Sequence, residues 1–183
     1  MSVPVLIGVV VGVLVIGGLV GAVLLYALAS GEGGPSRFSA VQASQGFFDK
    51  GASFAVTAQI TVPGPVERVW ALVAQGGYLD GWPLITGPTR AGDVLTVRTP
   101  LLALSEKVVH EDGEEFVAIG TGLSVPIVLK SFGERWRLAA DKDKVVVQWT
   151  VALTPRWIGW LPLRWTAFAV RPFLTEILAL ALR

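Results

Sequence analysis

The chain has 183 residues, of which 52% are hydrophobic and only 16% are charged, so it is unusually apolar for a soluble protein. Its 15 lysines and arginines nearly balance its 14 aspartates and glutamates, which argues against a nucleic-acid partner. The absence of cysteine excludes disulfides, iron–sulfur clusters and thiolate zinc sites, and the single histidine argues against a transition-metal site.

The N-terminal segment has the composition of a membrane span. No charged side chain precedes Glu32, and Val3–Ala29 consists almost entirely of Val, Leu, Ile, Gly and Ala. At 1.5 Å per residue, about 27 helical residues extend roughly 40 Å, enough to cross a hydrocarbon core about 30 Å thick. We therefore expect a single-pass protein of the cell membrane.

A cleaved signal peptide is the alternative for this segment, because Ala27-Leu28-Ala29 before Ser30 has the small residues of a cleavage site. The segment lacks a basic n-region, however, and it exceeds the usual apolar length of about 7–15 residues, so the pattern favours a retained anchor. Arg37 and Lys50 follow the helix, whereas only the α-amino group precedes it, and this bias favours a cytoplasmic domain.

The composition divides the chain into three parts: an anchor at 1–30, a linker at 31–52 and one domain at 53–183. The linker is rich in glycine and in small and polar residues, as connecting segments are. Its three apolar interruptions can dock either on the domain or on the bilayer surface; they are Phe38, Phe47 and Phe48.

The domain begins with a predicted strand and a predicted helix. Ser53–Val62 alternates apolar and polar side chains, which is the pattern of a strand with one buried face. Pro63-Gly64-Pro65 ends this strand, and Pro65 can occupy the first turn of a helix. Val66–Val73 has apolar residues at i, i+3, i+4 and i+7, which predicts an amphipathic helix that ends near Gly76-Gly77.

Beyond Gly92 the sequence has the pattern of antiparallel strands joined by short turns. The turn Glu111-Asp112-Gly113-Glu114 predicts a hairpin. After Pro155 the pattern becomes helical, and Leu163–Leu182 predicts a long apolar helix. The order of elements therefore predicts an α+β fold whose sheet is covered on one face. The expected strands are Val94–Thr99, Leu102–His110, Phe116–Gly120, Ile127–Leu138 and Val145–Leu153.

Four stretches of the domain resemble one known superfamily: Ala58–Val73, Trp82-Pro83, the hairpin Val108–Val117 and Trp136-Arg137-Leu138. Their order and spacing are similar to those of START-like proteins, also called SRPBCC proteins, which include polyketide cyclases and dehydratases and lipid-transfer domains. The resemblance implies a helix-grip fold, in which a curved antiparallel sheet wraps a long C-terminal helix. It also implies an apolar cavity for a ligand such as a sterol, phospholipid, quinone or polyketide. The N-terminal anchor departs from the usual pattern.

Polar residues inside apolar rows are the candidate ligand contacts. Alternation places Glu106 and His110 in one row, and Glu134 shares another row with Trp136. If these rows face the cavity, their polar groups can orient a ligand or exchange protons, because burial shifts their pKa. The alternatives are a bulge at Val108-Val109 that reverses the register, or a row that faces solvent. The expected ligand-binding residues are Trp82, Glu106, His110, Glu134, Trp136 and Trp149.

Aromatic and arginine side chains are interleaved in the last part of the chain, where Glu176 is the single acid after residue 155. Such a mixture suits the headgroup region of a membrane, and it suits a protein interface equally well. The alternative is that the aromatic rings fill the concave face of the sheet. The residues expected to contact a membrane or a partner are Trp157, Trp160, Arg164 and Trp165.

Three functions fit these observations. The first is a membrane-tethered protein that binds a hydrophobic small molecule or lipid, and the second is a non-catalytic accessory subunit of a larger membrane protein complex. A polyketide cyclase or dehydratase is least favoured, since the sequence has no nucleophile elbow, phosphate loop or metalloprotease motif; we expect no catalytic residue and no cofactor. An open apolar cavity of several hundred Å³ supports binding, whereas a cavity filled by Trp and Phe supports the accessory role.

Overall fold

The computed structural model describes residues 3–30, 46–79, 85–125 and 129–182. Seven strands form one sheet in the order β1-β7-β6-β5-β4-β3-β2, and every neighbouring pair is antiparallel. The strands are β1 (Phe54–Pro63), β2 (Thr86–Ala91), β3 (Val94–Arg98), β4 (Ala103–Glu111), β5 (Glu115–Leu123), β6 (Leu129–Asp141) and β7 (Lys144–Pro155). The helices are α1 (Val3–Ser30), α2 (Val66–Gln75) and α3 (Ala167–Ala181), with short helices η2 (Phe47–Gly51), η3 (Gly77–Leu79) and η4 (Leu163–Thr166).

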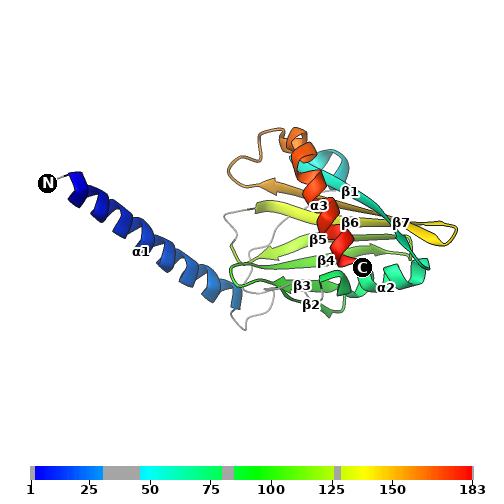
Figure 1. Cartoon of the computed structure of the whole chain (residues 1–183). Helices are drawn as coiled ribbons and strands as arrows, with labels where there is room; N and C mark the ends of the chain where they lie inside the picture. Colours follow the sequence, from blue (N-terminus) through cyan, green and yellow to red (C-terminus); the bar gives the residue numbers. More distant parts are fainter. Residues whose placement is uncertain (1–2, 31–45, 80–84, 126–128, 183) are drawn as a thin grey trace.

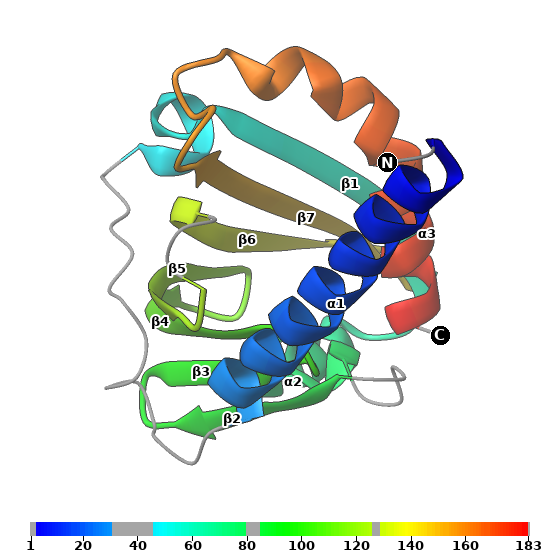
Figure 2. The same cartoon turned by 90° about the vertical axis from the view of Figure 1, so that its left-hand side faces the viewer.

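The sheet is curved, and α2 and α3 lie on the same face of it (Figures 1 and 2). The predicted α+β helix-grip fold is therefore confirmed, as is the hairpin between β4 and β5. The apolar face predicted for β1 is the inner face, where Val56, Ala58 and Val62 are buried. β2 was not predicted, because Thr86–Ala91 is an exposed edge strand that contains Gly and Pro and has no apolar alternation.

The C-terminal end of α2 is fixed over the sheet by contacts from β2. Gly76 ends the helix with a φ of 75°, and the ring of Pro88 occupies the space that a β-carbon at Gly76 would need. Arg90 donates to the Ala74 carbonyl at 2.7 Å and forms an ion pair with Glu111 at 2.6 Å. These contacts determine where the chain continues into η3.

The C-terminal helix buries one stripe of side chains. The predicted helix Leu163–Leu182 is divided in the structure, because its first turn is the 3-10 helix η4 and α3 begins at Ala167. Leu174 and Leu178 of α3 are buried in the core with the inner face of the sheet. The opposite side of the helix is apolar and exposed, because the sheet covers only one stripe of the helix surface.

The short helix η2 packs on the outer face of the sheet. The Phe48 ring lies over Gly133, and the Arg135 guanidinium stands 5.2 Å from the centre of that ring. Arg164 donates from Nη2 to the Phe48 carbonyl and from Nε to that of Ala52, so its guanidinium is occupied in holding η2. Of the three linker phenylalanines, two therefore dock on the domain, and Phe38 lies outside the described residues.

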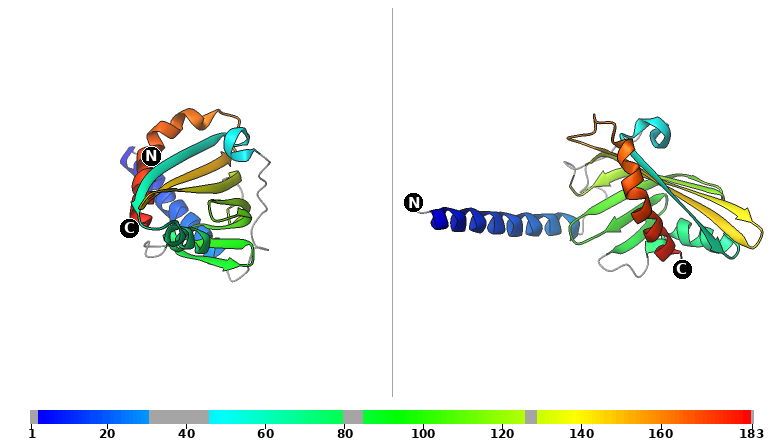
Figure 3. Two further views of the ribbon diagram at one scale, coloured as in Figure 1. Left: turned by 90° about the vertical axis from the view of Figure 1, so that its right-hand side faces the viewer. Right: turned by 45° about the horizontal axis from the view of Figure 1, so that its top comes forward.

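Helix α1 projects from one end of the sheet as a separate rod (Figure 3). Its residues Val11–Ala29 are long and apolar enough to cross a membrane, a property that signal sequences share. The last turn contacts the domain: Ala29 is buried against Ala103 of β4, and Arg98 of β3 donates to the Ala29 carbonyl at 2.7 Å.

We expect Leu178→Ala to lower the free energy of unfolding by about 2–5 kcal/mol, because it leaves a cavity where α3 meets the sheet. The matched control is Leu180→Ala, on the exposed side of the same helix, with an expected change within about 0.5 kcal/mol. Urea unfolding of the full chain in detergent, followed by tryptophan fluorescence, measures both. Equal effects of the two substitutions would contradict the packing of α3 described above.

Candidate functional site

Three aromatic rings fill the centre of the inner face. Trp136 of β6 and Trp149 of β7 are directly opposite in the register, and their rings stack with centroids 4.9 Å apart. Tyr78 of η3 lies against Trp136 with a centroid distance of 4.7 Å. The Trp136 side chain is 0% exposed, so this part of the interior is packed with side chains.

The carboxylate of Glu134 is the polar centre of this cluster. Tyr78 Oη donates to Glu134 Oε1 at 2.8 Å, and Trp149 Nε1 donates to Glu134 Oε2 at 3.0 Å. Trp136 Nε1 is buried nearby and makes no hydrogen bond with the described residues, although its proximity helps to lower the pKa of the carboxyl. Two elements besides β6 therefore supply donors to one buried acid.

A second carboxyl, that of Glu106, shares the same face. Glu106 on β4 is opposite Gly120, and Glu134 on β6 is opposite Ala118, so the two acids flank the small residues of β5. Both glutamates are only 6% exposed. Within the described part of the chain, no donor forms a hydrogen bond with the Glu106 carboxyl.

The two acids favour different protonation states. Burial and the charge of Glu134 raise the pKa of Glu106 well above its usual value. Burial also raises the pKa of Glu134, but the hydrogen bonds from Tyr78 and Trp149 oppose that shift by stabilising the anion. The pKa of Tyr78 is raised by burial and by the two acids, so this hydroxyl stays a donor. Of the two carboxyls, that of Glu106 is therefore the one that favours the protonated form more strongly.

His110, expected in the row of Glu106, lies outside the cluster. The register between β4 and β5 shifts between Val108 and His110, so Val108 faces Ala118 whereas His110 is paired with Val117. His110 is exposed, and its Nε2 lies 2.9 Å from Oδ2 of Asp112 in the hairpin turn. The expectation that His110 faces the interior was therefore wrong. The reason is a bulge at this position, which was the alternative considered from the sequence.

The other expected residues divide as follows. Glu106, Glu134, Trp136 and Trp149 come together in one cluster, and Trp82 lies outside the described residues. Tyr78 was missed by the sequence pattern. A lone tyrosine after a helix has no periodicity to indicate burial, and its partner is 56 positions away in the chain.

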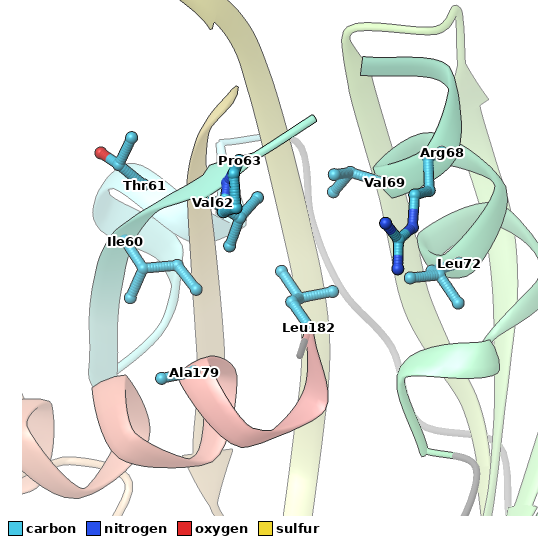
Figure 4. Close-up of a pocket in the computed structure, with 9 residues that line it drawn as sticks. All are labelled: Ile60, Thr61, Val62, Pro63, Arg68, Val69, Leu72, Ala179 and Leu182. Carbon is cyan, nitrogen blue, oxygen red and sulfur yellow. The ribbon is translucent and has the colours of Figure 1, made fainter. Parts of the chain in front are cut away.

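A pocket of about 510 Å³ lies on the same sheet as the acid cluster, between the end of β1, helix α2 and the end of α3 (Figure 4). Arg68 of α2 extends its guanidinium into the gap between α2 and Leu182. Among the described residues this guanidinium makes no hydrogen bond or ion pair. The walls are otherwise mostly apolar: Ile60, Thr61, Val62, Pro63, Val69, Leu72, Ala179 and Leu182.

The sequence pattern contained a signal for this pocket. Ile60 and Val62 belong to the predicted inner row of β1, and Val69 belongs to the predicted apolar stripe of α2. Their meeting at one end of the sheet depends on how α2 and α3 are placed over it, which no local pattern specifies.

Glu106→Gln should stabilise the protein at pH 8 by at least about 1 kcal/mol, since a buried acid without donors costs free energy when it ionises. In the wild type the folded chain keeps a proton that the unfolded chain releases above about pH 4.5, so stability falls as the pH rises from there. Urea unfolding at pH 4.5 and pH 8 should show the gain at pH 8 only. The control Glu67→Gln, on the exposed side of α2, should change stability by less than about 0.5 kcal/mol at either pH. A gain of equal size at both pH values would contradict a raised pKa for Glu106.

Comparison with solved structures supports the fold at low sequence identity. A START superfamily protein from Mycobacterium smegmatis is 16% identical with a TM-score of 0.53, and the match covers 70% of this chain and 93% of that one. A hypothetical protein from Helicobacter pylori is 11% identical with a TM-score of 0.54, over 79% of this chain and 95% of that one. Protein XoxI from Bacillus cereus is 16% identical with a TM-score of 0.51, over 70% and 93%. The search of curated proteins finds no match.

A family model matches most of the chain. The matched residues, 53–181, begin just before β1 and end with α3, so they include the sheet, the acid cluster and the pocket. The family is described as polyketide cyclase / dehydrase and lipid transport. With this match and the helix-grip architecture, the chain belongs to that family of the START-like superfamily.

Proposed function

We propose that the chain is a membrane-anchored protein that binds a hydrophobic small molecule or lipid in the pocket between β1, α2 and α3. The observation that carries the proposal is a pocket of about 510 Å³ with mostly apolar walls in a domain of this family. The anchor is α1, whose described part has the length and composition of a span. The cytoplasmic position of the domain stays a prediction from the charge pattern.

The position of the pocket favours a ligand that enters from the aqueous side. Val62 and Pro63 in its wall are paired with Val145 and Lys144, where β7 begins. Helix α1 contacts Ala103 at the opposite end of the sheet. A ligand in this pocket is therefore separated from the proposed bilayer by the length of the strands.

The charge at the pocket supports an amphiphilic ligand with an anionic group. The Arg68 guanidinium has no partner among the described residues and lies beside an apolar wall, so it can pair with a carboxylate or phosphate while the chain of the ligand occupies the pocket. The acid cluster is a less favourable place for that group, because a second anion beside a buried carboxylate is repelled.

The accessory-subunit role is the second candidate, and two observations favour it. Three aromatic rings fill the centre of the inner face, where a large ligand would otherwise lie. The outer side of α3 also exposes Phe168 and Phe173, which can contact a partner. A cyclase or dehydratase has less support, since a substrate reaches Glu106 or Glu134 only if neighbouring side chains move.

Ala179→Trp should abolish retention of a co-purified ligand, because the indole fills the pocket between α3 and β1. Ala169→Trp is the matched control on the exposed side of the same helix, and it should leave retention unchanged. Native mass spectrometry of the full chain, with lipid analysis of the released molecule, measures both. Equal retention by the two variants, or no bound molecule in the wild type, would favour the accessory role.

Arg68→Gln should weaken binding of a dansylated long-chain fatty acid by about 1.4- to fivefold, since an exposed ion pair contributes roughly 0.2–1 kcal/mol. The methyl ester of the same probe has no anionic group, so the substitution should leave its affinity unchanged. Fluorescence titration of the full chain in detergent gives both affinities. A parallel loss for acid and ester would mean that Arg68 acts on the shape of the pocket and does not pair with the anion.

A further inference from the structure

We propose that the end of the domain beside α1 lies in the headgroup region of the bilayer that α1 spans, with the segment 156–162 and Trp165 as the contact surface. We call this set of residues the aromatic end. The proposal rests on the membrane anchor of the proposed function and is independent of what the pocket binds.

The aromatic end exposes more aromatic surface than a soluble domain usually does. Trp157, Trp160 and Trp165 are 75%, 80% and 68% exposed, and Ile158 between the first two is also exposed. A tryptophan has an apolar body and one N–H donor, a combination that is enriched where hydrocarbon meets headgroups.

The segment is a built turn that holds these side chains outward. A β-carbon at Gly159 would lie 2.2 Å from the Pro155 carbonyl oxygen, so the chain folds back on the end of β7 at a distance that only glycine permits. Leu161 N donates to the Ile158 carbonyl at 3.0 Å and closes the turn. With Gly159 turned inward, the large side chains on either side of it are directed to the surface.

The strand register puts this turn at the end of the sheet to which α1 is attached. Pro155 is paired with Leu129 where β6 begins, and β5 ends at that same edge with Leu123 opposite Leu104. The next pair along, Arg98 and Ala103, holds the last turn of α1. In Figures 1 and 3 the loop before α3 and the end of α1 accordingly lie at one end of the domain.

This placement favours a lipid bilayer as the partner of the aromatic end. If α1 spans a membrane, its attachment fixes the height of the domain and brings the aromatic end to the level of the headgroups. The charge agrees, since Arg156 is the one charged residue in the sequence of the segment 156–162, and the headgroup surface attracts cations. Arg164 does not belong to this surface because it holds η2.

The test uses single-cysteine spin labels in the full chain, which has no cysteine of its own. Ile158→Cys places a label on the aromatic end, and Asp143→Cys places the control in the exposed turn between β6 and β7, at the other end of the sheet. Both proteins are incorporated into nanodiscs of phosphatidylcholine and phosphatidylglycerol in a 3:1 ratio. Power-saturation spectroscopy then compares the access of oxygen with that of a water-soluble nickel chelate.

We expect the ratio of oxygen access to nickel access to be several-fold higher for the label at 158 than for the control. Trp157→Ser with Trp160→Ser, added to Ile158→Cys, should bring the ratio close to the control, while circular dichroism shows that the domain stays folded. A ratio at 158 equal to the control overturns the proposal. A label that neither reagent reaches also overturns it, because protein then covers the surface.

The mass of the intact protein shows whether the anchor is retained, so loss of the anchor can be distinguished from failure of the contact surface. A mature chain that begins at Ser30 lacks α1 and will not enter the nanodiscs, which overturns the anchor and this proposal together. Ligand retention by the pocket is measured separately and does not depend on that outcome.

Discussion

The hydrogen bonds to the buried carboxylate of Glu134 are the interaction on which the interior depends. An acid removed from water is costly unless donors replace the lost hydration, and here the donors come from Tyr78 on η3 and Trp149 on β7. The tyrosine reaches the acid only if the end of α2 is held over the sheet, which is the role of Gly76 and its contact with Pro88. The end of α2, the helix η3 and the strands β6 and β7 are thus connected through one polar group. The stacking of Trp136 on Trp149 follows from the same arrangement.

The second acid explains why the centre of the sheet is not simply apolar. Glu106 has no donor among the described residues, and burial with the charge of Glu134 raises its pKa, so the interior favours its neutral form. The two acids lie on either side of β5, and the ring of Phe132 occupies the space that a β-carbon at Gly120 would need. With aromatic rings packed around this pair, the volume for a ligand lies farther along the sheet, where β1, α2 and α3 diverge.

The elements with regular patterns could be predicted from the sequence, and the features set by tertiary contact could not. The strand patterns identified β1 and β3 to β7, and the spacing of apolar residues identified α2 and the C-terminal helix. β2 was missed because an exposed edge strand needs no apolar row. His110 was placed on the wrong face because a bulge moves every later side chain by one position, and the sequence marks no such insertion. The cluster of Glu106, Glu134, Trp136 and Trp149 was expected, but its organiser, Tyr78, was not, since only the fold brings it to the acid.

The two ends of the sheet differ in chemistry, and that difference bears on how the proposed tether and the proposed binding pocket would work together. At 3.3 Å per residue, the 12 residues of β7 extend about 40 Å from Lys144, beside the pocket, to Pro155, beside the aromatic turn and the attachment of α1. A carrier that takes its ligand directly from the bilayer needs its opening at the membrane end. Here that end exposes tryptophans, and the pocket of about 510 Å³ opens at the other end, next to Arg68, which has no partner among the described residues. The arrangement therefore suits a domain held at a fixed height, which presents its pocket to amphiphiles or to soluble proteins on the aqueous side.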